Sequence, residues 1–244
     1  MHQPLVLPRD IAGIKLPDSA LAQKAVDLAF RVSPDVDRTK RSLRGGRPRE
    51  FDAGEALGSM QRKLWTAGLS GASLESIAGS AGLNRPSLAA AFGDKNAIYA
   101  QAAAQYAAMM DERLSEALDN EDLEAALLKA FDTAIDVYTA DGPNGCFVLC
   151  TAPAEAPMNP VCRNILDQSL NAIDALFRRR LERERKRMRV SPSDLSVLAA
   201  QLGATLHTLA LRARAGWTRE RLRRLASGAV DQLLASVGGF GRVR

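Results

Sequence analysis

The sequence predicts an all-α protein with about nine core helices. Apolar residues make up 46% of the 244 residues and aromatic residues only 5%, so leucine, alanine, valine and isoleucine must supply the core. Alanine-rich composition with few β-branched runs favours helices over strands. Apolar residues recur at helical spacing along most of the chain, and no segment alternates with period two for long enough to indicate a strand.

Residues 1–44 form an N-terminal extension to this fold. Three prolines interrupt residues 1–17, so no sustained helix is expected there. Residues 18–32 have apolar side chains at helical spacing and predict one short amphipathic helix, capped by Asp18 or Ser19. The basic, Gly- and Pro-containing residues 33–50 predict a flexible linker. No function follows from this extension.

Regular helical periodicity starts at Asp52. A first helix ends at Gly68, a second opens at Ser73, and a third, short helix covers residues 85–91. Longer helices are expected over about 95–118, 122–139 and 160–187, with the short segment CFVLCTAPAEAP before the last of these. Two final helices each have a leucine-rich apolar stripe. We therefore divide the chain into residues 1–44, 45–97 and 98–240.

The stretch SIAGSAGLNRPSLAAAFGDK, residues 76–95, breaks the helical pattern and restarts it at once. Two helices that cross steeply need a small side chain at the crossing, which Ala78 supplies. They also need a turn residue that tolerates positive φ, which Gly82 supplies. The spacing predicts a helix-turn-helix corner. A helical corner alone is also common in proteins that do not bind DNA.

The new helix begins with residues suited to nucleic acid. Asn84 can cap it, and Pro86 lies in its first turn, where a missing N–H group does no harm. Arg85 and Ser87 are then exposed at the helix start, where they could enter a major groove and contact base edges or phosphates.

Charge is strongly segregated along the chain, whose net charge is +5. Residues 38–95 have ten basic and five acidic side chains, residues 96–177 have three and thirteen, and residues 178–244 have sixteen and five. A basic surface beside an acidic region indicates a polyanion partner. The run RRRLERERKRMR, 178–189, is a rival footprint for DNA, but we interpret it as a solvated helix end whose basic charge suits the helix dipole.

Four elements supply the predicted DNA contacts: the basic arm and the starts of three helices. The predicted contact residues are Arg44, Arg47, Arg49, Ser73, Asn84, Arg85, Pro86, Ser87 and Lys95.

Residues 46–98, from GRPREFD to GDKNAI, resemble the DNA-binding domain of the tetracycline-repressor (TetR) family. The resemblance implies a homodimer whose second, all-helical domain binds a small molecule and thereby controls operator binding. One feature departs from the family. Many members have a tyrosine directly after the leucine of the recognition helix, whereas Leu88 is followed here by Ala89, Ala90 and Ala91, which leaves the base-reading surface thin.

The resemblance also assigns roles to the rest of the chain, although an ordinary core would give the same patterns. The stripes of the last two helices imply a dimer interface formed by Leu195, Leu198, Leu202, Leu206, Leu209, Leu222, Leu225, Ala229 and Leu233. A mostly apolar effector pocket would be lined by Tyr106, Met110, Phe131, Tyr138, Phe147, Cys150 and Phe177.

We therefore expect a DNA-binding transcriptional repressor that binds a palindromic double-stranded operator as a homodimer and is released by a small-molecule effector of unknown identity. The alternatives are a ligand-independent nucleoid-type DNA-binding protein and a regulator that senses oxidants through Cys146 and Cys150. With His2 and His207 as its only histidines and three cysteines, the chain predicts no enzyme, metal site or cofactor. No apolar run reaches the roughly 18 residues of a membrane span and no secretory signal is evident, so a cytoplasmic protein without membrane contact is expected.

Overall fold

The computed structural model describes residues 10–11, 14–15 and 52–240. The predicted helix at 18–32 and the linker with Arg44, Arg47 and Arg49 lie outside these residues. The described part of the extension is an antiparallel pair, β1 (Asp10–Ile11) and β2 (Ile14–Lys15), which the sequence analysis did not predict. Among the described helices, none has the length and apolarity needed to cross a membrane.

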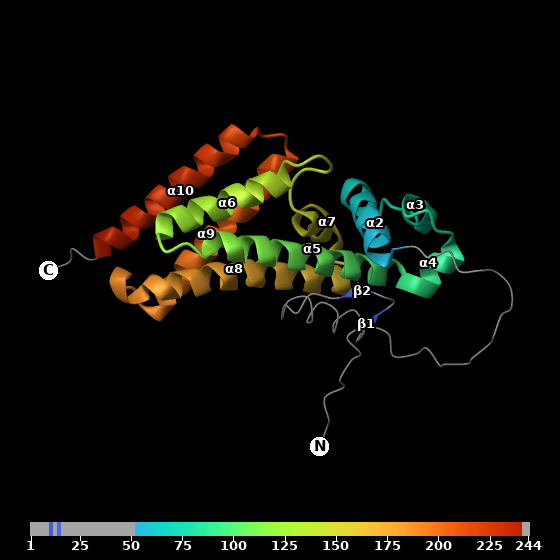
Figure 1. The fold of residues 1–244 in the computed structure, drawn as a ribbon, viewed down its shortest axis with the longest axis horizontal. Coiled ribbons are helices and arrows are strands. Elements are labelled where there is room, and N and C mark those ends of the chain that lie inside the picture. The colour runs from blue at the N-terminus through green and yellow to red at the C-terminus, as the bar shows by residue number, and fades with distance from the viewer. Residues whose placement is uncertain (1–9, 12–13, 16–51, 241–244) are drawn as a thin grey trace, which may run out of the picture. The chain divides into compact units, whose positions relative to one another are not determined.

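The chain divides into two compact units, Met1–Gln105 and Tyr106–Arg244. The described helices of the first unit are α2 (Ala53–Ala67), α3 (Leu74–Ser80), α4 (Arg85–Phe92) and the beginning of α5 (Lys95–Leu118) (Figure 1). The division falls within α5, whereas the sequence predicts a boundary between residues 97 and 98.

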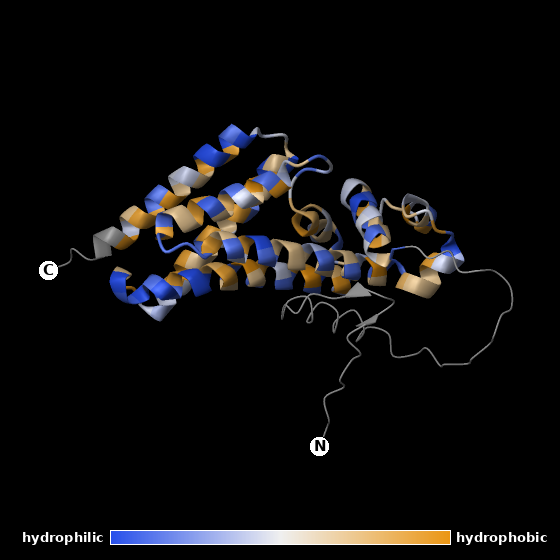
Figure 2. Ribbon diagram, viewed as in Figure 1, coloured by the Kyte–Doolittle hydropathy of each residue, from blue (hydrophilic) through white to orange (hydrophobic). Residues whose placement is uncertain are grey.

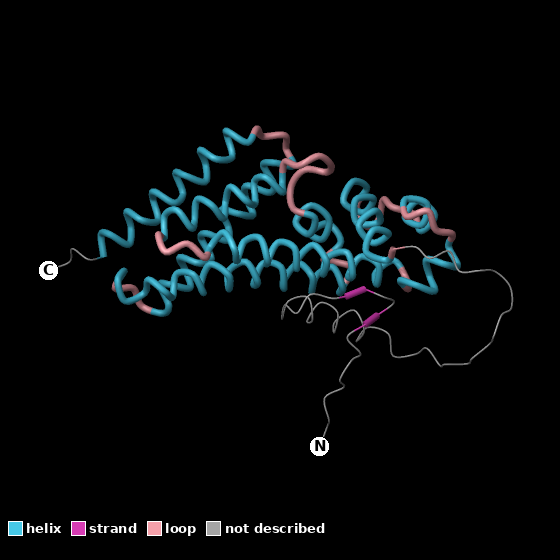
Figure 3. The backbone as a smooth tube through the Cα atoms, viewed as in Figure 1, coloured by secondary structure: helices cyan, strands magenta, loops and turns pink. Residues whose placement is uncertain are grey.

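The second unit contains the rest of α5 and the helices α6 (Leu123–Tyr138), α7 (Phe147–Glu155), α8 (Pro160–Met188), α9 (Pro192–Arg214) and α10 (Arg219–Phe240). Helix α8 packs along α9, α10 packs on α6 and α9, and α7 packs on α8 and α9. Loops join these helices in Figure 3, including the loop 139–146 between α6 and α7. Apart from the two-residue strands, the described chain is helical, which confirms the predicted all-α class.

Local sequence explains where the helices begin and end. The side chain of Asp52 accepts a hydrogen bond from the N–H group of Glu55 at 2.9 Å, and Asp122 accepts one from Ala125 at 2.7 Å. These caps satisfy N–H groups that have no partner within the helix. At the other end of α2, Gly68 has φ +76°, a conformation that favours glycine.

The long helices of the second unit carry both hydrophobic and hydrophilic residues (Figure 2), and burial shows which side chains lie in the core. Five leucines predicted as dimer contacts are at most 1% exposed within the single chain, so they form its own core instead: Leu195, Leu202, Leu206, Leu209 and Leu222. Of the other predicted contacts, Leu198 and Leu233 are 8% and 7% exposed, and Leu225 and Ala229 are half-buried. Of the nine predicted dimer contacts, these four are the ones that lie near the surface of α9 and α10.

The side chains predicted to line an effector pocket lie in the core of the second unit. The ring centroids of Tyr106 and Phe147 are 6.0 Å apart, and those of Phe131 and Phe177 are 5.7 Å apart. Tyr138 and Met110 are also buried, whereas Cys150, the remaining member of the set, is half-buried.

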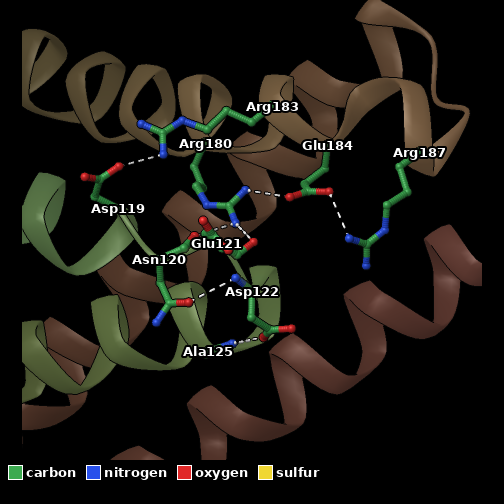
Figure 4. Close-up of polar contacts among 9 residues, drawn as sticks. All are labelled: Asp119, Asn120, Glu121, Asp122, Ala125, Arg180, Arg183, Glu184 and Arg187. Atoms are coloured by element: carbon green, nitrogen blue, oxygen red, sulfur yellow. Dashed lines mark hydrogen bonds and ion pairs between the residues drawn. The ribbon is translucent and has the colours of Figure 1, made fainter.

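The basic run 178–189 is not entirely a solvated helix end, because Arg180 is only 3% exposed. Its Nη2 atom donates to the carbonyl oxygens of Asn120 and Glu121, at 2.9 and 3.1 Å, in the turn between α5 and α6 (Figure 4). Its Nη1 atom pairs with Glu184 at 3.3 Å. By contrast, Arg183 lies on the outer side, 59% exposed and paired with Asp119. Our interpretation of the run therefore holds for Arg183 and is wrong for Arg180.

Candidate DNA-binding surface

A tight turn between α3 and α4 forms the predicted helix-turn-helix corner. The N–H group of Leu83 donates to the carbonyl oxygen of Ala78 at 2.9 Å, and that of Gly82 donates to Gly79 at 3.1 Å. These two bonds, with Gly82 at φ +66°, are the helix-ending pattern in which glycine adopts the left-handed conformation. Ala78 is 2% exposed. The turn therefore uses Gly82 as the sequence predicts, and a small side chain is buried where the helices approach.

Helix α4 buries one face and exposes the opposite face. Leu88 and Phe92 are 1% and 3% exposed and anchor the inner face. The outer face consists of the exposed residues Arg85, Pro86, Ser87, Ala89 and Ala90. All of these except Arg85 have short side chains, so the helix backbone lies close to whatever the outer face contacts.

Two predicted contact residues serve first as helix caps. Asn84 Oδ1 accepts a hydrogen bond from the N–H group of Ser87 at 2.9 Å, and Ser73 Oγ accepts one from Ser76 at 3.1 Å. Both side chains are exposed and use acceptor oxygens in the cap. Their donors, the amide of Asn84 and the hydroxyl of Ser73, remain chemically suited to a phosphate oxygen.

The start of α5 is less favourable to an anion than its helix dipole alone suggests. Lys95 is its first residue and is half-buried. The preceding Asp94 caps the helix by accepting a hydrogen bond from the N–H group of Ala97 at 2.8 Å. One N–H group is thus already occupied, and a carboxylate lies at the helix start, so Lys95 must provide the attraction for phosphate.

Arg85 has a partner that the sequence does not predict. Its Nη1 atom lies 3.4 Å from Oε1 of Glu75, in the first turn of α3, and the two side chains are 59% and 73% exposed. The two residues are ten apart in the sequence and lie in different helices, so helical spacing does not predict their contact. Asp94 was also missed, although its place between Gly93 and Lys95 is a recognisable capping signal.

In the first unit Ser73, Asn84, Arg85, Pro86 and Ser87 are all exposed, the Arg85–Glu75 pair links the starts of α4 and α3, and Lys95 is the first residue of α5. The arm residues Arg44, Arg47 and Arg49 lie outside the described part of the chain. The resulting surface offers hydrogen-bond donors and positive charge, the chemistry that a DNA backbone and guanine bases require.

The cysteines of the second unit do not form an activated thiol pair. Cys146 is the residue directly before the first turn of α7, and Cys150 lies one turn further on, with its N–H group donating to the carbonyl oxygen of Cys146 at 3.0 Å. Burial raises the pKa of the Cys146 thiol to about 11 and also raises the pKa of Cys150, against the opposing effect of Arg214. Since the thiolate is the reactive form, these shifts argue against oxidant sensing at neutral pH. Among the described residues, no group of three or more histidine, cysteine or acidic side chains could hold a metal ion.

Known transcriptional regulators share this architecture. No protein-family model matches the chain. The HTH-type transcriptional repressor ComR of Escherichia coli K12 is 24% identical over 185 residues, which cover 74% of the chain and 88% of ComR. A cysteine mutant of the TetR family transcriptional regulator CifR, complexed with a 26-base-pair operator DNA, is 28% identical with a TM-score of 0.70, covering 76% of this chain and 98% of CifR. A TetR-family regulator from Streptomyces coelicolor shares the fold at 17% identity, with a TM-score of 0.62 and coverage of 75% and 94%.

Proposed function

We propose that the chain is a transcriptional regulator of the TetR family, a repressor that binds a palindromic operator as a homodimer and is released by a small-molecule effector. The observation that carries this proposal is the exposed start of α4, where Arg85 and Ser87 are aimed outward by the corner at Gly82. The likeness to CifR bound to operator DNA and to the repressor ComR supports it.

Dimerisation would present two copies of α4 to half-sites about one DNA turn, roughly 34–36 Å, apart. A groove of about 590 Å³ between α9 and α10 suits a second chain. Leu198, Ala229 and Leu233 line it together with Val197, which is 57% exposed. We therefore assign the dimer contact to this rim, with the neighbouring Leu225, rather than to the five leucines in the core.

The effector is proposed to enter the aromatic core of the second unit, among Tyr106, Met110, Phe131, Tyr138, Phe147, Cys150 and Phe177. An effector that binds one arrangement of these side chains more tightly than another shifts the population between them. Release follows if the favoured arrangement spaces the two recognition helices unsuitably for the operator.

Selection of bound duplexes from random DNA tests the proposal. We expect a palindrome, and we expect Arg85→Ala to abolish the preference for it while the variant keeps its fold. A screen for compounds that release the selected duplex then tests the effector role. Strong binding without sequence preference, and without any compound that causes release, would favour the nucleoid-type alternative. A monomer without preference among duplexes at ordinary ionic strength would refute the proposal.

A further inference from the structure

The outer face of α4 concentrates base recognition on one side chain. Pro86, Ala89 and Ala90 have no hydrogen-bonding side-chain group, and Ser87 has only a short hydroxyl. Arg85 is the one residue of α4 able to donate two parallel hydrogen bonds to a base edge. Whatever fixes the orientation of Arg85 therefore decides how well α4 distinguishes one base from another.

Glu75 is placed to fix that orientation. Its carboxylate contacts only Nη1 of Arg85, at 3.4 Å, across the corner between α3 and α4. The Nε and Nη2 atoms of Arg85 have no hydrogen-bond partner among the described residues, so one edge of the guanidinium remains available. An arginine side chain has many rotamers, and a partner that restricts them reduces the entropy lost on binding.

The charge of Glu75 also indicates which DNA group Arg85 contacts. Glu75 is 73% exposed on the surface proposed to face a polyanion, where its carboxylate repels phosphates. A carboxylate beside an arginine weakens simple attraction to the backbone, but it orients the planar guanidinium for a directional contact. The arrangement thus suits selectivity for a base better than affinity for a phosphate. The base with two acceptors that match the guanidinium is guanine, through O6 and N7.

We infer that Glu75 is a positioning residue that holds Arg85 to read one guanine in each operator half-site. This inference rests on the DNA-binding function proposed above and adds to it the residue that orients the recognition side chain and the base that is read.

The test uses the full chain and the duplex obtained by selection. Each guanine of one half-site is replaced in turn by 7-deazaguanine, which still pairs with cytosine but lacks the N7 acceptor. Dissociation constants are measured by fluorescence anisotropy at fixed salt for the wild type, Glu75→Gln and Glu55→Gln. Glu55 is the matched control, because it is an exposed acidic residue in the first turn of α2 in the same unit. Both substitutions remove one negative charge from a helix start.

For the wild type we expect one of these single replacements to weaken binding at least about fivefold. In Glu75→Gln this penalty should fall about two- to fivefold, the effect of an exposed ion pair, while affinity for a scrambled duplex does not fall. In Glu55→Gln the penalty should match the wild type. A penalty unchanged in Glu75→Gln, an equal reduction in Glu55→Gln, or no sensitive guanine at all would overturn the inference and leave operator binding standing. Failure to select any duplex would instead refute the proposed function.

Discussion

Removing the Arg180 side chain is expected to destabilise the protein far more than removing its neighbour Arg183. Arg180→Ala deletes the donor to the two carbonyl oxygens of the turn between α5 and α6, and it removes the buried one of the two arginine partners of Glu184, which keeps the exposed Arg187 at 3.4 Å. The Arg180 side chain is 2% exposed and that of Glu184 14%, so water replaces these contacts poorly. Breaking a buried pair costs ~3–5 kcal/mol of the free energy of unfolding when the remaining charge has no other partner, and we expect the lower end of that range because Glu184 keeps Arg187.

Arg183→Ala is the matched control, because it removes the same side chain one turn later in α8. Its partner Asp119 is 73% exposed and Arg183 itself 59%, so the pair is worth ~0–1 kcal/mol. Urea unfolding followed by circular dichroism, at one protein concentration for all variants, measures both losses. If Arg180→Ala loses no more free energy than Arg183→Ala, the contacts of Arg180 do not stabilise the second unit and the reasoning fails.

Three further changes test other features. Gly82→Ala should lower the free energy of unfolding by at least ~1 kcal/mol, because Gly82 has φ +66°. Gly79→Ala is the control: this residue lies in α3, no atom lies within 4 Å of the added methyl group, and the change should be neutral or stabilising. Equal effects of the two substitutions would contradict the role of the turn. Alkylation at pH 8 should modify half-buried Cys150 well before Cys146, because a pKa of about 11 leaves roughly a thousandth of the Cys146 thiol ionised. Mass spectrometry measures the order, and faster modification of Cys146 would argue against its burial. Burial lowers the pKa of His207 below 6.5, so the stability that its neutral form contributes is present above pH 6.5 and is lost as pH falls through the lower folded-state pKa. His207→Gln should therefore reduce the drop in Tm between pH 7.5 and pH 5, and an undiminished drop would exclude His207 as its source.

Helix positions were predictable because the signals that set them are local. Ser73 and Asn84 cap α3 and α4 from the positions the sequence indicates, and Gly68 and Gly82 adopt the positive φ that a helix end requires. Each of these signals needs only three or four neighbouring residues. At these four helix ends the backbone conformation is the one that the local sequence predicts.

The partner of each face was not predictable, because periodicity reports that a stripe is apolar and not what covers it. Leu202 and Leu206 are covered by their own chain, although the same stripe would suit a second copy. Arg180 is a charged residue whose burial was likewise not predicted. It lies on the buried side of α8 with Phe177 and Leu181, but it is part of a basic run, which by itself predicts exposure to solvent. The pairing of Glu75 with Arg85 depends on the angle of the corner, which no spacing rule gives.

Because α4 offers few side chains that can contact bases, the proposed function requires a dimer for specific DNA binding. One bidentate contact between arginine and guanine discriminates by ~1–3 kcal/mol. Specific DNA binding usually exceeds nonspecific binding by ~4–10 kcal/mol, so one half-site read by Arg85 alone falls short of that range. Two half-sites double the discrimination to ~2–6 kcal/mol, which reaches its lower part. A variant that disrupts the α9–α10 rim, such as Val197→Asp, should therefore lose operator selectivity while its weak, salt-dependent binding to any duplex persists. A monomeric variant that keeps full selectivity would show that contacts beyond α4 read the operator.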